Sequence, residues 1–215
     1  KRVIFAEGED ERVLRAAQVL IEENIAEPIL IGRPSIIANR LDRFGLKIRP
    51  QTDFEVVNPE DDPRFRSYVD DYFGLVGRKG VIPEAARTIV RTNSTVIAAL
   101  ALRRNEADAM ICGLEGRYQK HLRDVSQIIG KAPGVIEYAA LSLLIGQRGA
   151  TFLVDTSVCF DPSAEQIAAV TEMAAREIRR FGIVPRAALL SHSNFGSRDS
   201  ESSEKMRRAA ALIKE

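Results

Sequence analysis

The sequence contains no tryptophan and only two cysteines among its 215 residues. Cys112 and Cys159 each lie within an apolar stretch and lack the spacing of metal ligands, so we expect buried thiols in a reducing compartment, with the cytoplasm as the default location. No run approaches the roughly 20 apolar residues of a membrane span, and the first residues lack the basic and apolar regions of a secretory signal. The composition therefore predicts neither a membrane segment nor secretion.

The sequence also has no large excess of positive or negative charge, because 31 lysines and arginines nearly balance 30 aspartates and glutamates and leave a net charge of +1. The arginines are scattered along the chain, so nucleic acid is not expected as the main partner. Three fingerprints are missing as well: the glycine pattern of dinucleotide-binding folds, the P-loop and the paired cysteines of zinc sites. Nothing in the sequence therefore supports a nicotinamide, P-loop or zinc site within these residues.

Apolar strands alternate with amphipathic helices along the chain, which predicts an α/β fold with a parallel sheet. The acidic stretch 7–11 lies at the start of the first helix, where carboxylates suit the positive end of the helix dipole, and we prefer that interpretation to a metal site. The segment 138–145 is too short and uniform to assign to a helix or a strand. The expected strands are 2–6, 28–31, 55–57, 107–112, 151–154 and 186–190, with helices over 13–21, 35–44, 63–76, 83–91, 94–104, 118–129, 162–181 and 202–215.

The clearest hinge signal is the segment 131–134, Lys-Ala-Pro-Gly, which predicts one α/β domain over 1–130 and a second over 131–215. In the second domain, a helix capped by Asp161 leads to the strand 186–190, which would complete a strand–helix–strand unit. The helix 202–215 runs to the last residue without a capping signal. We therefore expect the chain to be a piece of something longer, with a second domain that is incomplete at its C-terminus.

Two loops carry chemically suggestive residues directly after predicted strands, where ligands bind in open α/β sheets. The segment 113–123 combines two glycines with several cations, which would suit a phosphate or nucleotide near a helix N-terminus. The segment 191–197 offers hydroxyl and amide groups, and on spacing alone a ligand loop and an ordinary cap-rich turn are equally good interpretations. Arg78, between two glycines, either holds a phosphate or merely solvates a turn. His121, a lone histidine on a helix, receives no role.

Several stretches resemble the phosphate acetyltransferase family, in order, from the first residue to the last. The segment 5–12 is similar to that family's Phe-Pro-Glu-Gly-Glu-Asp-Glu-Arg start, and the segments 161–166 and 181–186 match two further family stretches. The resemblance implies two Rossmann-like, three-layer αβα domains with a cleft between them, in which an acetyl group passes between coenzyme A and phosphate. The family's catalytic serine, arginine and aspartate lie in a C-terminal part that is absent here, so no residue receives a catalytic role.

Two departures from active members change the expected function. Where those members have His-Thr-Thr-Ala-Asp, this chain has the segment 116–120, Gly-Arg-Tyr-Gln-Lys, and the lysine of their serine-rich stretch is replaced by Phe195. Losing that charge and those hydroxyls should weaken the orientation of a small anion in the transition state, while groups able to bind coenzyme A remain. Both departures are similar to the C-terminal domain of bacterial NADP-dependent malic enzymes.

This second resemblance implies a domain that senses acetyl-CoA and assembles oligomers, attached to a malic enzyme half that would hold NADP and a divalent metal. A working phosphate acetyltransferase and a free-standing acyl-CoA or phosphate-binding module are the alternatives. The expected partners are an acyl-CoA ligand, the attached catalytic half and further copies of the chain. The candidate acetyl-CoA ligands are Arg78, Arg117, Tyr118, Arg123, Ser191, Ser193, Asn194, Gly196 and Ser197.

Overall fold

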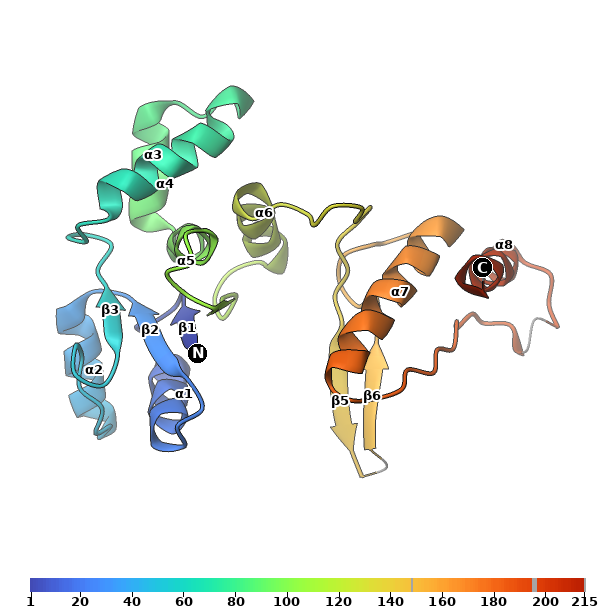
Figure 1. Cartoon of the computed structure of the whole chain (residues 1–215), viewed down its shortest axis with the longest axis horizontal. Helices are drawn as coiled ribbons and strands as arrows, with labels where there is room; N and C mark the ends of the chain where they lie inside the picture. The colour runs from blue at the N-terminus through green and yellow to red at the C-terminus, as the bar shows by residue number, and fades with distance from the viewer. Residues whose placement is uncertain (148, 195–196, 215) are drawn as a thin grey trace. The chain divides into compact units, whose positions relative to one another are not determined.

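The computed structural model describes residues 1–147, 149–194 and 197–214, which form two compact units, Lys1–Gly130 and Lys131–Glu215. The first unit is built on a four-stranded parallel sheet in the order β3-β2-β1-β4 (Figure 1). Its strands pair in register, with Ile4 of β1 opposite both Ile29 of β2 and Met110 of β4. The strands are β1 (Arg2–Phe5), β2 (Glu27–Ile31), β3 (Glu55–Val57) and β4 (Ala109–Ile111).

The two faces of this sheet are covered by different helices, because successive strand side chains point to opposite faces. Ile4 packs with α3 to α6 in one core, whereas Phe5 packs with α1 and α2 in the other (Figure 1). Helix α5 is buried along most of its length, which its nearly uniform apolar sequence allows. The helices are α1 (Glu11–Glu22), α2 (Pro34–Phe44), α3 (Phe65–Val76), α4 (Pro83–Thr92), α5 (Ser94–Arg103) and α6 (Tyr118–Ile128), with a 3₁₀ turn η1 (Gly77–Lys79) after α3.

The acidic stretch before α1 has the structural role that its position predicts. The Asp10 carboxylate caps α1 by accepting a hydrogen bond from the Arg12 N–H at 2.8 Å. The Glu9 carboxylate accepts from the Arg33 backbone N–H and from its guanidinium, each at 2.9 Å. These bonds tie the β1–α1 turn to the start of α2, and in the described part of the chain no group of three or more acidic, histidine or cysteine residues could hold a metal ion.

The Glu9–Arg33 pair should make stability pH-dependent. The hydrogen bond from Arg33 lowers the pKa of Glu9 and outweighs the opposing effect of partial burial. A carboxyl group whose pKa is lower in the folded state contributes stability above its ordinary pKa and loses it as the pH falls through the folded value. We therefore expect Glu9→Gln to cost about 1–2 kcal/mol of unfolding free energy at pH 7, a difference that shrinks below about pH 4.

Urea unfolding at several pH values measures this difference. Glu23→Gln is the matched control, because Glu23 is an exposed glutamate in the turn after α1. A deficit for Glu9→Gln that stayed constant from pH 7 to pH 3 would contradict the charge-dependent origin.

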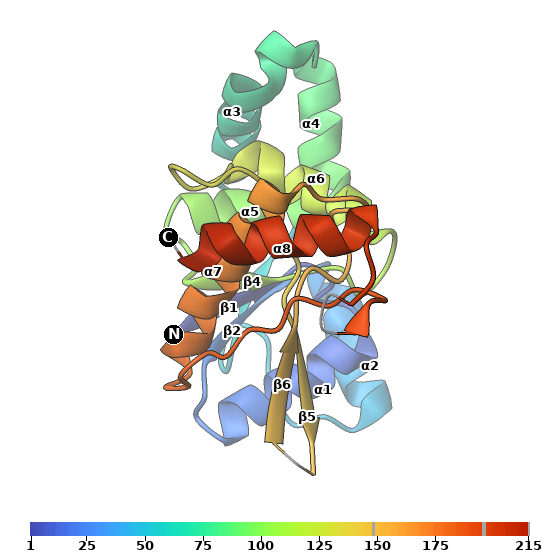
Figure 2. The same ribbon diagram turned by 90° about the vertical axis from the view of Figure 1, so that its right-hand side faces the viewer.

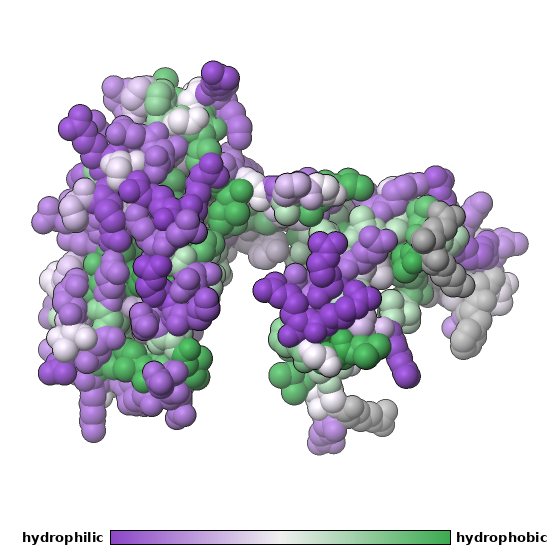
Figure 3. Space-filling view, in the orientation of Figure 1, coloured by the Kyte–Doolittle hydropathy of each residue, from purple (hydrophilic) through white to green (hydrophobic). Residues whose placement is uncertain are grey.

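The second unit contains a β-hairpin and two long helices. Strands β5 (Ser142–Gly146) and β6 (Gly149–Leu153) pair antiparallel, and α7 (Ala164–Arg180) packs against α8 (Glu201–Lys214). Figure 2 looks onto α8 and the hairpin. The segment 138–145, for which helix and strand were both open, thus supplies most of a strand. The apolar side chains of this hairpin are largely exposed, Ile145 at 83% (Figure 3).

Two expectations for the second unit are wrong. Helix α7 is capped by Ser163 rather than Asp161, because Ser163 and Gln166 form a reciprocal capping box at 3.2 and 2.8 Å. The segment 186–190 is not a strand, and no parallel strand–helix–strand unit is formed by the described residues of this unit. Its backbone runs without a ladder partner, and an apolar sequence alone does not make a strand unless another strand accepts its hydrogen bonds.

Candidate functional site

The loop between β4 and α6 leaves the sheet at the carboxyl end of β4. Two glycines shape it, Gly113 with φ 101° and Gly116 with φ 98°, values that L-residues with side chains rarely adopt. A Cβ atom at Gly116 would lie 3.1 Å from Nε2 of His121. The loop therefore depends on glycine for its turn and for its close approach to the histidine ring.

Glu7 holds the start of this loop. One oxygen of its carboxylate accepts hydrogen bonds from the backbone N–H groups of Gly113 at 2.9 Å and Leu114 at 3.3 Å. The neighbouring Ala6 N–H donates to the Ile111 carbonyl at 3.0 Å, which continues the pairing of β1 with β4 beyond the strands. The end of the first strand thus fixes a loop that lies more than a hundred residues away in the sequence.

His121 holds the other side of the loop, a role that its residue type alone did not predict. Its Nε2 lies 2.7 Å from the Glu115 carbonyl oxygen, and its Nδ1 lies 2.8 Å from the Thr95 hydroxyl. A carbonyl can only accept, so Nε2 donates to Glu115, and in the neutral ring Nδ1 accepts from Thr95. Thr95 is 1% exposed, so this contact anchors the loop to the buried start of α5.

Removing the histidine should release the loop. We expect His121→Ala to cost about 1–3 kcal/mol of unfolding free energy, because the buried Thr95 hydroxyl and the Glu115 carbonyl each lose a partner. His121→Gln, which keeps an amide donor and an acceptor, should retain more of this stability. Urea unfolding of both variants measures the difference, and equal stability of His121→Ala and the unmodified chain would contradict the anchoring role.

The loop leads into the N-terminus of α6, which has no side-chain cap. Arg117 occupies the N-cap position of α6 and makes no side-chain capping bond, and no acidic residue lies in the first turn. The first N–H groups of a helix lack partners within the helix and carry positive partial charge, which favours an anion. Arg117, Tyr118, Lys120 and Arg123 are all exposed around this end of α6, with Tyr118 at 51%. In the described ranges no carboxylate forms an ion pair with these three cations.

One face of α6 is held against the rest of the first unit. Asp124 accepts a hydrogen bond from the Asn93 side chain at 2.8 Å, and Asn93 caps α5 through the Val96 N–H at 3.4 Å. On the helical wheel Arg123 lies opposite the buried side that carries His121 and Ile128. Arg117 and Tyr118 therefore lie at the start of α6, and Arg123 lies in its second turn, on the side opposite His121.

Arg78 lies on η1, directly after α3, and is exposed. Gly80, with φ 92°, ends this turn. Helix α3 packs against α6. Burial, and then the charge of Asp124 on α6, raises the pKa of Tyr72 on α3. Arg78 therefore belongs to the same unit as Arg117, Tyr118 and Arg123. None of the residues that the structure describes forms an ion pair with Arg78.

The serine-rich segment belongs to the second unit. The hydroxyl of Ser191 accepts from the Ser193 N–H at 3.2 Å, and that of Ser193 accepts from the Arg198 N–H at 3.0 Å. The Ser197 N–H donates to the Asn194 carbonyl at 3.0 Å. In this local turn the hydroxyls of Ser191 and Ser193 stabilise the backbone by accepting hydrogen bonds from N–H groups. Gly196 and Phe195 lie outside the described residues.

The two thiols are not activated nucleophiles. Burial raises the pKa of Cys112 at the end of β4, and the charge of Glu7 raises it further. Burial likewise raises the pKa of Cys159, followed by the charge of Asp155. A thiol with a raised pKa stays protonated at neutral pH and is a poor nucleophile. Both cysteines are free thiols without a disulfide partner.

The sequence profile described as phosphate acetyl/butaryl transferase matches residues 1–215. The chain belongs to this family. Over 99% of its length it also superimposes on a crystal structure of a phosphotransacetylase from Streptococcus pyogenes, with a TM-score of 0.86 and 27% identity, and it covers 64% of that chain. The α/β fold expected from the sequence is thereby confirmed.

Two relatives place the family domain within longer proteins. The chain is 76% identical over 214 residues to an NAD-dependent malic enzyme of Rhizobium meliloti and 49% identical over 215 residues to an NADP-dependent malic enzyme of Escherichia coli. It spans 28% of the length of each of these malic enzymes. This chain is therefore similar to a phosphotransacetylase-like domain of a malic enzyme, as the resemblance in its motifs implies.

Among the residues that the structure describes, no helix is long and apolar enough to cross a lipid bilayer.

Proposed function

We propose that this chain is the acetyl-CoA-sensing domain of a malic enzyme and does not itself transfer acetyl groups. The observation that carries the proposal is the N-terminus of α6, which Glu7 and His121 hold in place and near which Arg117, Lys120 and Arg123 form no ion pair with any residue that the structure describes. Acetyl-CoA has the matching chemistry, since its nucleotide end carries several phosphate charges. The malic enzyme relatives support the assignment to a malic enzyme, because the whole length of this chain matches a part of each of them.

In the proposed complex, Arg78 and Arg123 bind the nucleotide phosphates, and Arg117 and the first N–H groups of α6 add a further anion contact. Tyr118 packs against the ligand. Ser191, Ser193 and Ser197 contact the acyl end through their hydroxyls, and Asn194 through its amide. Acetyl-CoA can change the activity of an attached catalytic half only through a difference in its affinity for two conformations of the protein.

The metal and nicotinamide chemistry of a malic enzyme belongs to the rest of the polypeptide in this proposal. The described residues offer no cluster of metal ligands, and the sequence lacks a dinucleotide fingerprint. The two malic enzyme relatives differ in the nicotinamide that their names give. We place the protein in the cytoplasm, which its free thiols suit, and propose that these domains also assemble the oligomer.

The alternative is an active phosphate acetyltransferase, which the family name and the structural match favour. The segment 116–120 argues against it, because cations and a phenol replace hydroxyls that would orient a small anion.

Two measurements on the same preparation separate these functions. Calorimetric titration with acetyl-CoA measures binding, and a coupled assay follows acetyl transfer from acetyl phosphate to coenzyme A. Binding without turnover, together with a change in malate oxidation by the full-length enzyme when acetyl-CoA is added, supports the sensor. Turnover would establish the transferase instead, and the absence of binding would overturn both.

A further inference from the structure

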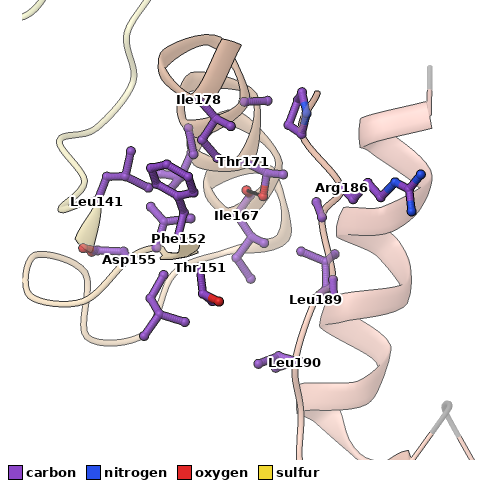
Figure 4. Close-up of a pocket in the computed structure, with 18 of the residues that line it drawn as sticks. Leu141, Thr151, Phe152, Asp155, Ile167, Thr171, Ile178, Arg186, Leu189 and Leu190 are labelled. Atoms are coloured by element: carbon purple, nitrogen blue, oxygen red, sulfur yellow. Dashed lines mark hydrogen bonds between the residues drawn. The ribbon is translucent and has the colours of Figure 1, made fainter. Parts of the chain in front are cut away.

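Polar side chains are arranged differently in the two units. In the second unit, Thr171 lines an apolar groove of about 780 Å³ and donates to the Ile167 carbonyl one turn earlier in its own helix, at 2.8 Å. Arg186, which also lines the groove, points toward α8 (Figure 4). In the first unit, by contrast, charged side chains from β3, from the start of α3 and from the turn between α5 and β4 form one network.

Glu106, in the turn between α5 and β4, lies at the centre of this network. Its carboxylate accepts hydrogen bonds from the guanidinium groups of Arg104 at 2.7 Å and Arg64 at 3.3 Å. The hydroxyl of Tyr68, a residue that is 1% exposed, donates to the same carboxylate at 2.5 Å. Burial, and then this hydrogen bond, raises the pKa of Tyr68, so the phenol stays protonated and remains a donor. Glu106 therefore holds the first turn of α3.

Arg104, at the C-terminal end of α5, makes a second connection to the same helix. Its guanidinium donates to the Ser67 hydroxyl at 3.0 Å and to the Asp71 carboxylate at 2.9 Å. The four residues of this helix end that Arg104 and Glu106 contact are spaced three and four positions apart, so they lie along one face. The two residues thus hold one face of α3 over about two turns.

The start of α3 is also tied to β3. Arg64 occupies the N-cap position of α3, where a cation opposes the helix dipole. Asp62 offsets that charge by accepting hydrogen bonds from the Arg64 N–H at 2.8 Å and from its guanidinium at 2.9 Å, and Glu55 of β3 accepts a further one at 2.9 Å. The Asp62 side chain is only 7% exposed, so solvent ions screen this pair weakly.

The other half of α3 is held by apolar contacts. Tyr72 and Val76 are buried in the core that this helix shares with α5 and α6. Apolar burial is not directional, so it holds the helix in place without fixing its tilt, whereas hydrogen bonds are directional. Helices α3 and α4 extend together beyond the sheet, and η1 with Arg78 lies at the far end of α3 (Figure 1). The directional contacts therefore act at one end of α3 and Arg78 lies at the other.

We infer that Glu106 is a positioning residue for Arg78, because the network around it fixes the tilt of α3. Arg78 comes ten residues after Tyr68, which corresponds to about 15 Å along a helix. At that distance a change in tilt of about 10° moves a residue by about 2–3 Å, enough to break a charge-assisted hydrogen bond of about 2.8 Å. The inference rests on the proposed role of Arg78 in binding acetyl-CoA and adds a residue that controls this role from the opposite end of the helix.

A double-mutant cycle in the full-length protein tests the coupling between Glu106 and Arg78. Glu106→Ala should weaken acetyl-CoA binding about tenfold by calorimetric titration, because Arg78 no longer lies where the phosphate is bound. In an Arg78→Ala background the same change should cost less than about twofold, since the group that it positions is already absent. Glu106→Gln keeps a side-chain oxygen that can accept from Tyr68 and should recover most of the affinity.

Leu41→Ala is the matched control for loss of stability. Leu41 is buried in the core on the other face of the sheet, so its truncation destabilises the unit without touching the network. It should leave the affinity within about twofold. Equal losses for Glu106→Ala with and without Arg78 would overturn the inference, and so would unchanged affinity of Glu106→Ala.

A distance measurement without acetyl-CoA separates this inference from the proposed function. Nitroxide labels are attached through ketone-bearing amino acids at Lys79 on η1 and Glu22 on α1, both exposed, in full-length protein diluted with unlabelled copies. By pulsed electron paramagnetic resonance, Glu106→Ala should shift or broaden the distance distribution by at least about 2 Å, and Leu41→Ala should not. An unchanged distribution would overturn the inference. A changed one supports it, even where the unmodified protein fails to bind acetyl-CoA and only the sensor function is overturned.

Discussion

Replacing Arg78 and Arg123 together with alanine is expected to weaken acetyl-CoA binding about a hundredfold or more. A charge-assisted hydrogen bond to phosphate contributes about 1.5–3 kcal/mol, and losing two of them corresponds to at least that change in Kd. Both side chains are exposed, and no ion pair to either is formed by the residues that the structure describes, so the fold should not change. Calorimetric titration of the double variant measures the loss.

Arg66→Ala is the matched control for this experiment. Arg66 is an exposed arginine near the start of α3, at the opposite end of that helix from Arg78. It should leave the affinity within about twofold, because a single distant surface charge is screened at physiological salt. An equal loss of affinity in the control and the double variant would show that general charge, rather than these two positions, governs binding.

Gly8→Ala is expected to destabilise the first unit by about 3 kcal/mol. A Cβ atom at this position would lie 2.7 Å from the Ile31 carbonyl oxygen and 2.8 Å from the Ile31 nitrogen, both of which are backbone atoms of β2. The Gly8 N–H also donates to that carbonyl at 3.1 Å, so the turn cannot move away without losing a hydrogen bond. Overpacking against backbone has a cost of this order.

Gly74→Ala provides the contrast, because no atom lies within 4 Å of the position where its Cβ would be built. Gly74 is in α3, where alanine should stabilise the helix by about 0.5–1 kcal/mol. Urea unfolding of both variants measures the two effects. If Gly8→Ala were as stable as Gly74→Ala, the close approach between the β1–α1 turn and β2 would be wrong.

Local patterns were sufficient to predict most of the first unit. The apolar run near the N-terminus predicts a strand over 2–6 and the structure has Arg2–Phe5, while a strand expected over 28–31 is observed as Glu27–Ile31. Helix α2 begins at a proline and ends at Gly45 with φ 65°, and both signals are visible in the sequence. These elements are fixed by neighbours in the chain, so hydrophobic periodicity and capping residues carry enough information.

The second unit shows where such patterns fail. The segment 186–190 has the composition of a buried strand, but whether it becomes one depends on a partner that its own residues do not specify. The capping error at α7 has a similar origin, since Asp161 and Ser163 both suit the position and only the pairing with Gln166 selects Ser163. A choice between equivalent local signals is made by contacts that a linear pattern does not contain.

In the candidate site, too, the roles of some residues follow from local sequence and the roles of others depend on the folded structure. The loop after β4 and the start of α6 could be predicted from the sequence, and they put Arg117 and Tyr118 at a helix start. That these residues and Arg123 bind one ligand stays a prediction. Glu7 and His121 could not be assigned their roles, although both were visible in the sequence. Glu7 follows the carboxyl end of β1 and accepts a hydrogen bond from Gly113, and His121 contacts the Thr95 hydroxyl at the start of α5. Both roles therefore exist only once the sheet and α5 are formed.

The bond between Glu7 and Gly113 makes the loop between β4 and α6 depend on the assembled sheet. It joins residues 106 positions apart, each just beyond one of the paired strands β1 and β4, so forming it carries the entropy cost of a long chain closure. A ligand that binds at the start of α6, as proposed, favours the form in which β1 and β4 are paired. It raises the free energy of unfolding of the unit by an amount that grows with the ratio of free ligand concentration to Kd.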